Sequence, residues 1–257
     1  MTGRHTRDVS TRERDHVTVR TEAGEMPAQL WLPDEGSGPG ILLLQEIFGV
    51  SGYIARRAAD LAEVGYVVLA PELYWRLDTG PLDMSDPDVI GTAMGLVQQL
   101  DWQTTVGDAV AALDALRSRP EVRGGTGVVG FCFGGGLGFN VAAVSDPDAL
   151  VSYYGSSLPN LLDLVPQVRA PSLHHFGLAD DFLILEVVER ISSAVVDGPA
   201  DVQVETYAGA NHAFDNADYP MHHAEASAVA WQRTLDFLRQ RLPVDDPASA
   251  TSATGAA

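Results

Sequence analysis

The sequence contains no lysine and only one cysteine, Cys132. Without lysine, the chain cannot form a Schiff base with pyridoxal phosphate, and it lacks the lysine of a phosphate-binding P-loop. A single cysteine excludes an internal disulfide and a cysteine-based zinc cluster. All 16 basic residues are arginines, so we expect a bound anion to be met by arginine.

Positive charge is also scarce relative to negative charge. The 16 arginines face 35 aspartates and glutamates, which gives a formal net charge of −19. Nucleic acids and anionic membrane surfaces both require basic patches, so neither is expected as a partner. No apolar run approaches the ~20 residues of a membrane span, and the polar N-terminus lacks the apolar core of a signal peptide. We therefore expect a cytoplasmic protein.

The 257 residues suffice for a sizeable core. Residues 1–15 and 244–257 are polar and poor in large apolar side chains, so flexible tails are expected there. Residues 16–243 show no repeat and no abrupt change in composition. They are interpreted as a single domain.

Short apolar runs alternate with helical patterns along this domain, which predicts an α/β fold with a mostly parallel sheet and helices on both faces. The first two strands are expected to form an antiparallel pair. Strands are predicted at 16–20, 28–32, 41–45, 66–70, 127–131, 150–154, 172–176 and 202–207. Helices are predicted near 54–64, 106–117, 134–144, 185–195 and 222–241. Ligands of such sheets bind beyond the carboxyl ends of the strands.

Cys132 lies in the segment GFCFGG, between an apolar strand and a helix of small residues. This is the nucleophile-elbow pattern G-x-S-x-G with cysteine in place of serine. The turn strains the backbone at the nucleophile, and its glycines let strand and helix approach closely. The N-terminal N–H groups of the helix lower the pKa of a thiol and bind an oxyanion. The alternatives are a buried structural cysteine and a dinucleotide-binding turn, although the latter normally lies in the first βα unit.

A cysteine nucleophile needs a base and a residue that orients the base. In this fold the chain order is nucleophile, acid, histidine. Asp180 follows one predicted strand and His212 follows the next. Asp180 is preferred as the orienting acid, and Asp181, which suits a helix N-cap, remains the alternative. His174 and His175 are adjacent on a strand, point to opposite faces and are interpreted as structural.

Further short motifs lie before and after the elbow, and their joint order along the chain is more specific than any one of them. They are QEIFG (45–49), PELYWR (71–76), YYG (153–155) and the turns at Asp180 and His212. With these segments, residues 27–242 resemble the dienelactone hydrolase family of α/β-hydrolases, also called carboxymethylenebutenolidases. The resemblance implies the α/β-hydrolase fold, hydrolysis of a small ester or lactone, and no metal or organic cofactor.

The resemblance also implies roles for individual residues. Cys132 would be the nucleophile, His212 the general base and acid, and Asp180 the orienting residue. Glu46 would contact the resting thiol and help to deprotonate it, and the N–H groups of Ile47 and Phe133 would form the oxyanion hole. Arg76 would pair with a substrate carboxylate, and Tyr154 would lie at the pocket wall.

The sequence departs from the family pattern after the histidine. The family has a substrate-binding arginine where this chain has Asn216, beside Asp215, so Asn216 is expected at the substrate. One arginine should hold an anionic lactone less tightly than two, which puts dienelactone itself in question as the substrate.

These observations predict a cysteine hydrolase of lactones or enol esters, with a small, anionic substrate. The protein would be a monomer or a small homo-oligomer. The alternatives are a broader carboxylesterase or thioesterase, and a catalytically silent hydrolase-fold protein that binds a ligand or senses oxidants through Cys132.

Overall fold

The computed structural model describes residues 14–77, 79 and 82–244. Of the flexible tails predicted at 1–15 and 244–257, residues 1–13 and 245–257 lie outside the described residues. The first strand already begins at Asp15, which the sequence assigned to the tail. The boundaries of the single domain at 16 and 243 stay a prediction.

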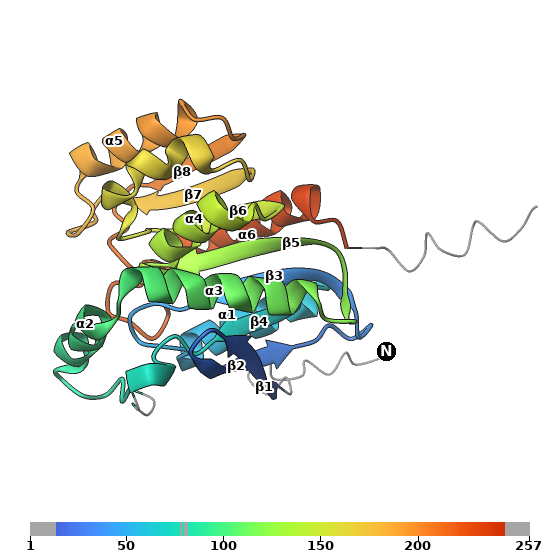
Figure 1. Ribbon diagram of the computed structural model, residues 1–257. Helices are drawn as coiled ribbons and strands as arrows, with labels where there is room; N and C mark the ends of the chain where they lie inside the picture. Colours follow the sequence, from blue (N-terminus) through green and yellow to red (C-terminus); the bar gives the residue numbers. More distant parts are fainter. Residues whose placement is uncertain (1–13, 78, 80–81, 245–257) are drawn as a thin grey trace, which may run out of the picture.

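Eight strands form one sheet in the order β1-β2-β4-β3-β5-β6-β7-β8 (Figure 1). The strands are β1 (Asp15–Thr21), β2 (Gly24–Trp31), β3 (Gly38–Leu44), β4 (Val67–Pro71), β5 (Val122–Phe131), β6 (Ala149–Tyr153), β7 (Ser172–Gly177) and β8 (Val202–Tyr207). β2 pairs antiparallel with β1 and β4, and every other neighbouring pair is parallel. The predicted α/β-hydrolase architecture and the antiparallel opening pair are confirmed.

Helices cover both faces of this sheet (Figure 1). They are α1 (Gly52–Glu63), α2 (Val89–Gln99), α3 (Trp102–Arg117), α4 (Phe133–Ser145), α5 (Leu185–Val196) and α6 (Ala224–Arg241). Short 3-10 helices lie at η2 (Trp75–Leu77), η3 (Leu158–Asn160) and η4 (Leu162–Gln167). α1 and α6 pack on one face, and α3, α4 and α5 pack on the other.

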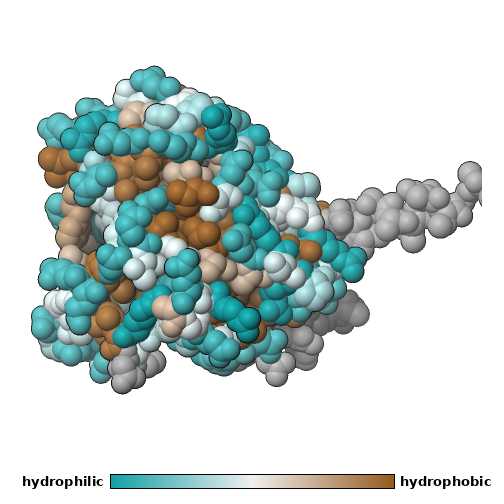
Figure 2. Space-filling model, in the orientation of Figure 1, coloured by the Kyte–Doolittle hydropathy of each residue, from teal (hydrophilic) through white to brown (hydrophobic). Residues whose placement is uncertain are grey.

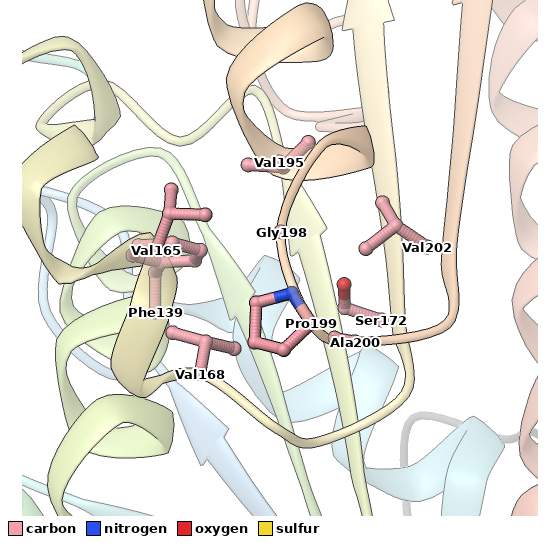
Figure 3. Close-up of a pocket in the computed structure, with 9 residues that line it drawn as sticks. All are labelled: Phe139, Val165, Val168, Ser172, Val195, Gly198, Pro199, Ala200 and Val202. Carbon is pink, nitrogen blue, oxygen red and sulfur yellow. The ribbon is translucent and has the colours of Figure 1, made fainter.

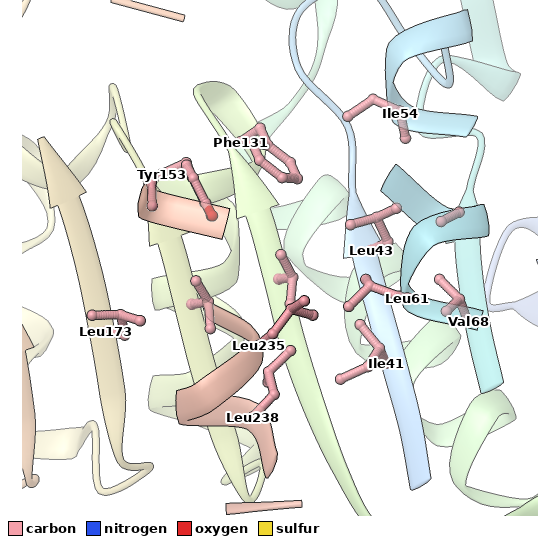
Figure 4. Close-up of a cluster of buried hydrophobic side chains, with 14 of the residues drawn as sticks. Ile41, Leu43, Ile54, Leu61, Val68, Phe131, Tyr153, Leu173, Leu235 and Leu238 are labelled. Atoms are coloured by element: carbon pink, nitrogen blue, oxygen red, sulfur yellow. The ribbon is translucent and has the colours of Figure 1, made fainter. Parts of the chain in front are cut away.

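The apolar core follows from the burial of the central strands on both faces. Every residue of β3, β4, β6 and β7 is buried. Figure 4 shows one side of this core, where strand residues such as Leu43 and Phe131 face Ile54 and Leu61 of α1 and Leu235 of α6. This packing fixes the strand ends relative to one another.

The parallel strands all end at one edge of the sheet, and the predicted site residues follow those ends. The opposite edge carries a small, mainly apolar pocket at the starts of β7 and β8 (Figure 3). Its lining residues are Phe139, Val165, Val168, Ser172, Val195, Gly198, Pro199, Ala200 and Val202. None of these residues was predicted to be functional.

Candidate active site

Cys132 occupies a strained turn between β5 and α4. Its φ is 53° and its ψ is −113°, values that few residues other than glycine adopt. A Cβ on Gly134 would lie 2.4 Å from the Leu44 carbonyl oxygen, so only glycine allows α4 to approach the end of β3. The Cys132 N–H donates to the Tyr153 carbonyl at 3.0 Å. The local geometry is therefore that of a nucleophile elbow.

The structure brings Cys132, His212 and Asp180 together from the ends of three strands. His212 Nε2 lies 3.1 Å from Cys132 Sγ, and His212 Nδ1 lies 2.8 Å from Asp180 Oδ2. The other carboxylate oxygen of Asp180 accepts the N–H groups of Phe182 and Leu183 at 2.7 and 2.8 Å. Asp180 is thus held in place and orients the imidazole.

Asp181 has a different partner. It contacts Asn211, whose amide nitrogen donates to the Asp181 carboxylate at 2.7 Å. Of the two aspartates that the sequence left open, the geometry therefore favours Asp180 as the residue that orients His212.

The charges in this group support one another. Burial alone would lower the pKa of His212, but the neighbouring Cys132 and Asp180 raise it to about 10. Burial raises the pKa of Asp180, yet the hydrogen bonds from His212, Leu183 and Phe182 outweigh it, and the pKa lies below its usual value. Both shifts favour a protonated imidazole beside an ionised Asp180 carboxylate.

Glu46 lies at the end of β3, 1% exposed. Asn216 Nδ2 donates to Glu46 Oε2 at 2.7 Å, and the Tyr154 hydroxyl lies 3.5 Å from Oε1. Burial is the main cause that raises the pKa of Glu46 to about 8, and the Asn216 hydrogen bond offsets only part of the effect. Asn216 was predicted to bind substrate, and in the structure its side chain contacts Glu46. Glu46 was predicted to contact the Cys132 thiol, whereas the thiol contacts His212.

The two expected oxyanion donors lie on segments that touch. Phe133 begins α4, and the first N–H groups of a helix have no partner within it. The Gly134 N–H donates to the Gln45 carbonyl at 3.0 Å, which joins the elbow to the loop that carries Ile47. The Tyr74 hydroxyl donates to the Ile47 carbonyl at 2.7 Å and fixes this peptide.

Tyr154 lies next to the histidine, and its expected place at the pocket wall stays a prediction. The centroids of the Tyr154 and His212 rings are 5.1 Å apart. Tyr154 and Ala213, the residue after His212, have φ values of 37° and 55°. Three of the four described non-glycine residues with positive φ thus lie at this site, which is typical of functional positions.

Arg76 is bound by another residue of the chain. Both terminal nitrogens of its guanidinium contact the buried carboxylate of Asp108 on α3, with Nη2 and Oδ1 2.8 Å apart. Trp75 Nε1 donates to the same carboxylate at 2.9 Å, and the Arg76 guanidinium stacks on the Trp75 ring at 4.2 Å. The predicted role of Arg76 as an anchor for a substrate carboxylate stays a prediction.

Sequence reasoning missed three neighbours of the site. Ser156 Oγ lies 3.8 Å from Cys132 Sγ. Phe182 packs its ring 5.0 Å from the His212 ring yet is 63% exposed. Asp215 is buried and pairs with Arg57 of α1. Only Phe182 carried a signal in the sequence, as a large apolar residue directly after the Asp180–Asp181 turn.

His174 and His175 point to opposite faces of the sheet, as predicted. His174 packs beside Phe139 of α4, whereas His175 contacts the hydroxyls of Tyr207 and Thr234. Burial lowers the pKa of both side chains. They are structural residues of the core.

Two negative findings concern the part of the chain that the structure describes. Its His, Cys, Asp and Glu side chains form no group of three that could hold a metal ion. No helix within the described ranges is long and apolar enough to cross a membrane.

The sheet order, the strained cysteine turn and the positions of the site residues define an α/β-hydrolase. The dienelactone hydrolase family model matches residues 26–242. A carboxymethylenebutenolidase of Pseudomonas sp. (strain P51) is 35% identical to this chain, over 86% of this chain and 92% of its own length. A carboxymethylenebutenolidase of Pseudomonas putida is 37% identical, over 80% of this chain and 87% of its own length.

A crystal structure from Klebsiella pneumoniae, described as that of a proposed dienelactone hydrolase, is 26% identical. It superposes with a TM-score of 0.77 over 89% of this chain and 98% of that one. The chain belongs to the dienelactone hydrolase family. It is a hydrolase that acts on ester bonds of a small-molecule substrate.

Proposed function

We propose that the protein hydrolyses lactones and related esters through a Cys132 thioester intermediate. The observation that carries this proposal is the chain of contacts from Cys132 Sγ to His212, at 3.1 Å, and from His212 to Asp180, at 2.8 Å. A nucleophile within hydrogen-bond reach of a base that a third group orients is the arrangement required for covalent catalysis.

In the first half-reaction the Cys132 thiolate attacks the ester carbonyl carbon and forms a tetrahedral oxyanion. The N–H groups of Ile47 and Phe133 stabilise this oxyanion. The C–O bond then breaks, and the leaving oxygen takes the proton of the His212 imidazolium. The acyl group remains on sulfur as a thioester.

In the second half-reaction neutral His212 removes a proton from water, and the resulting hydroxide attacks the thioester carbonyl. The C–S bond breaks, the acid product leaves, and the thiolate and imidazolium return. Thiolate is a better leaving group than an alkoxide, so a plain alkyl ester would tend to expel sulfur again. A stabilised enolate avoids this reversal, which favours enol lactones.

The catalytic cycle starts from the thiolate, and the proposal gives Glu46 the single step that precedes it: an ionised Glu46 carboxylate takes the proton from Cys132 Sγ once, a step that alkaline pH favours because the pKa of Glu46 is about 8. This role is supported by the position of Glu46 at the end of β3, the strand that the elbow touches through Gly134. A broader carboxylesterase or thioesterase would use the same residues. The breadth of esters and thioesters that the purified protein hydrolyses distinguishes these alternatives.

The test combines kinetics with mass spectrometry. With an activated 4-nitrophenyl ester, we expect a burst of one nitrophenolate per chain, a covalent acyl adduct on Cys132, and no turnover in Cys132→Ala. Because Cys132 is the only cysteine, alkylation by iodoacetamide should reach one label per chain and remove all activity. Turnover in Cys132→Ala equal to that of the unaltered protein would disprove the thiol mechanism.

A further inference from the structure

Arginines on the elements around the site are already paired with aspartates of the chain. Arg57 of α1 contacts buried Asp215 at 2.6 Å. Arg76 of η2 makes its two-point contact with buried Asp108. These guanidinium groups therefore neutralise internal carboxylates that would be costly to leave unpaired.

The third arginine of this region is Arg56, which contacts Asp218 at 2.6 Å. Both of these side chains are partly exposed, so the pair is screened by solvent. Asp215 and Asp218 flank Asn216 in the loop that follows His212. The chain thus places two carboxylates and a neutral amide in this segment, beside buried Glu46.

Asn216 is also fully engaged. Its amide nitrogen donates to Glu46, and its amide oxygen accepts the Asp218 N–H at 2.9 Å. Both polar atoms of the amide are used within the protein, and the side chain is 1% exposed. A substrate carboxylate that entered here would meet Glu46 and lose its hydration without gaining a counter-ion, which is unfavourable.

The other side of His212 is apolar. Phe182 packs on the imidazole, and the same loop and the start of α5 expose Leu178, Ile184 and Leu185. Figure 2 shows apolar surface in the region of α5, in the upper left of the view. Large apolar side chains exposed together beside a reactive centre are typical of a surface that binds apolar ligands.

From these contacts we propose that the substrate of this enzyme is an uncharged ester or lactone with an apolar acyl group. This differs from the anionic substrate that the resemblance implies. The inference rests on the proposed thiol hydrolysis, and it assigns Arg76 to the attachment of η2 to α3 through Asp108. The acyl group would lie toward Phe182.

The test compares three 4-nitrophenyl esters with one leaving group. They are the uncharged butyrate, the anionic hemisuccinate and the methyl ester of that hemisuccinate. The methyl ester has no charge on its acyl chain, and this chain is longer than that of the hemisuccinate. After correction for the rate with hydroxide alone, we expect kcat/KM for the butyrate and the methyl ester to exceed that for the hemisuccinate at least tenfold. Equal or faster turnover of the hemisuccinate would overturn the proposal.

Two controls separate the site from the overall charge of −19. The preference should persist in 0.5 M salt, because screening removes long-range repulsion but leaves contacts at the site. A preference that vanishes there would contradict the proposal. In Arg76→Gln the ratio of kcat/KM for the butyrate to kcat/KM for the hemisuccinate should stay within about twofold of the ratio in the unaltered protein. This ratio does not depend on the fraction of the variant that is folded. A tenfold selective loss of hemisuccinate turnover would instead show that Arg76 binds the carboxylate.

A binding measurement keeps this inference distinguishable from the proposed mechanism. N-phenylbutanamide and N-phenylsuccinamic acid are uncleaved analogues that differ in charge. Calorimetry with Cys132→Ala, which lacks the thiol, should show at least tenfold tighter binding of the butanamide. This result would stand even if the thiol mechanism failed, and tighter binding of the acid would overturn the inference with the mechanism intact.

Discussion

Glu46 is almost fully buried, between Asn216 and Tyr154, and its pKa of about 8 links the site to the stability of the fold. In the unfolded chain the carboxyl group loses its proton near the usual pKa of about 4.3. Between these two values the native state binds more protons than the unfolded state. The free energy of unfolding therefore falls as pH rises through this window and levels off above it.

The variant Glu46→Gln should remove this dependence. We expect the variant to gain stability relative to the unaltered protein between pH 5 and pH 8, by at least about 1 kcal/mol, since each pKa unit corresponds to about 1.4 kcal/mol. Urea unfolding at the two pH values measures the difference. Glu35, which is exposed, gives the control variant Glu35→Gln, for which the difference should not change. A constant difference for Glu46→Gln would show that the carboxyl group ionises normally.

At the scale of single elements, the approach of α4 to the end of β3 depends on glycine. A Cβ at position 134 would lie 2.4 Å from the Leu44 oxygen and 2.5 Å from the Gln45 oxygen, both backbone atoms. Backbone cannot move aside as a flexible side chain can. The N-terminus of α4, with Cys132 and Phe133, would therefore shift away from the loop after β3.

We expect Gly134→Ala to destabilise the fold by about 1–3 kcal/mol or more and to lower kcat in the protein that remains folded. Gly107→Ala is the matched control, because Gly107 lies within α3 with nothing within 4 Å of an added Cβ. It should stabilise the protein by up to about 1 kcal/mol and leave kcat unchanged. Thermal unfolding and steady-state kinetics report both effects, and equal behaviour of the two variants would contradict the packing argument.

The order of the elements was predictable from the sequence because buried strands and amphipathic helices leave clear periodic patterns. The helix α2 was missed, since Gly91 and Gly95 weaken its helical pattern. β5 begins at Val122, whereas the sequence predicted its start at 127. The first five residues were missed because they include the polar, glycine-containing run RGGT. Local patterns thus fail where glycine and polar residues lie inside an element.

The same limit applies to the candidate site. The order of Cys132, Asp180 and His212 could be predicted, because each follows a recognisable strand. The partner of Arg76 could not, because Asp108 lies 32 positions away on α3, and no local pattern joins the two. Likewise, Asn216 was expected at the substrate, and only the folded chain shows that its amide contacts Glu46.

Across the whole molecule, one buried ion pair joins the N-terminal and C-terminal halves of the chain beside His212. Asp215, three residues after His212, accepts hydrogen bonds from Tyr53 and Arg57 of α1 and from Ser227 of α6. The Arg57 guanidinium also lies 4.1 Å from the centroid of the Trp231 ring of α6. The loop that carries His212 is therefore attached to both helices on this face of the sheet.

Removing one partner of this pair should leave the other charge buried without compensation. We expect Arg57→Met and Asp215→Leu each to lower the free energy of unfolding by about 3–5 kcal/mol. The double variant should lose less than the sum, because it removes both charges, so the coupling energy should exceed about 1.5 kcal/mol. Urea unfolding of the four proteins gives the cycle.

Arg56 and Asp218 provide the control, since they join the same helix and loop but are 40% and 38% exposed, and their coupling should stay below about 1 kcal/mol. Similar coupling in the two cycles would mean that burial does not strengthen the Arg57–Asp215 contact, and the attachment of the His212 loop would then rest on packing alone.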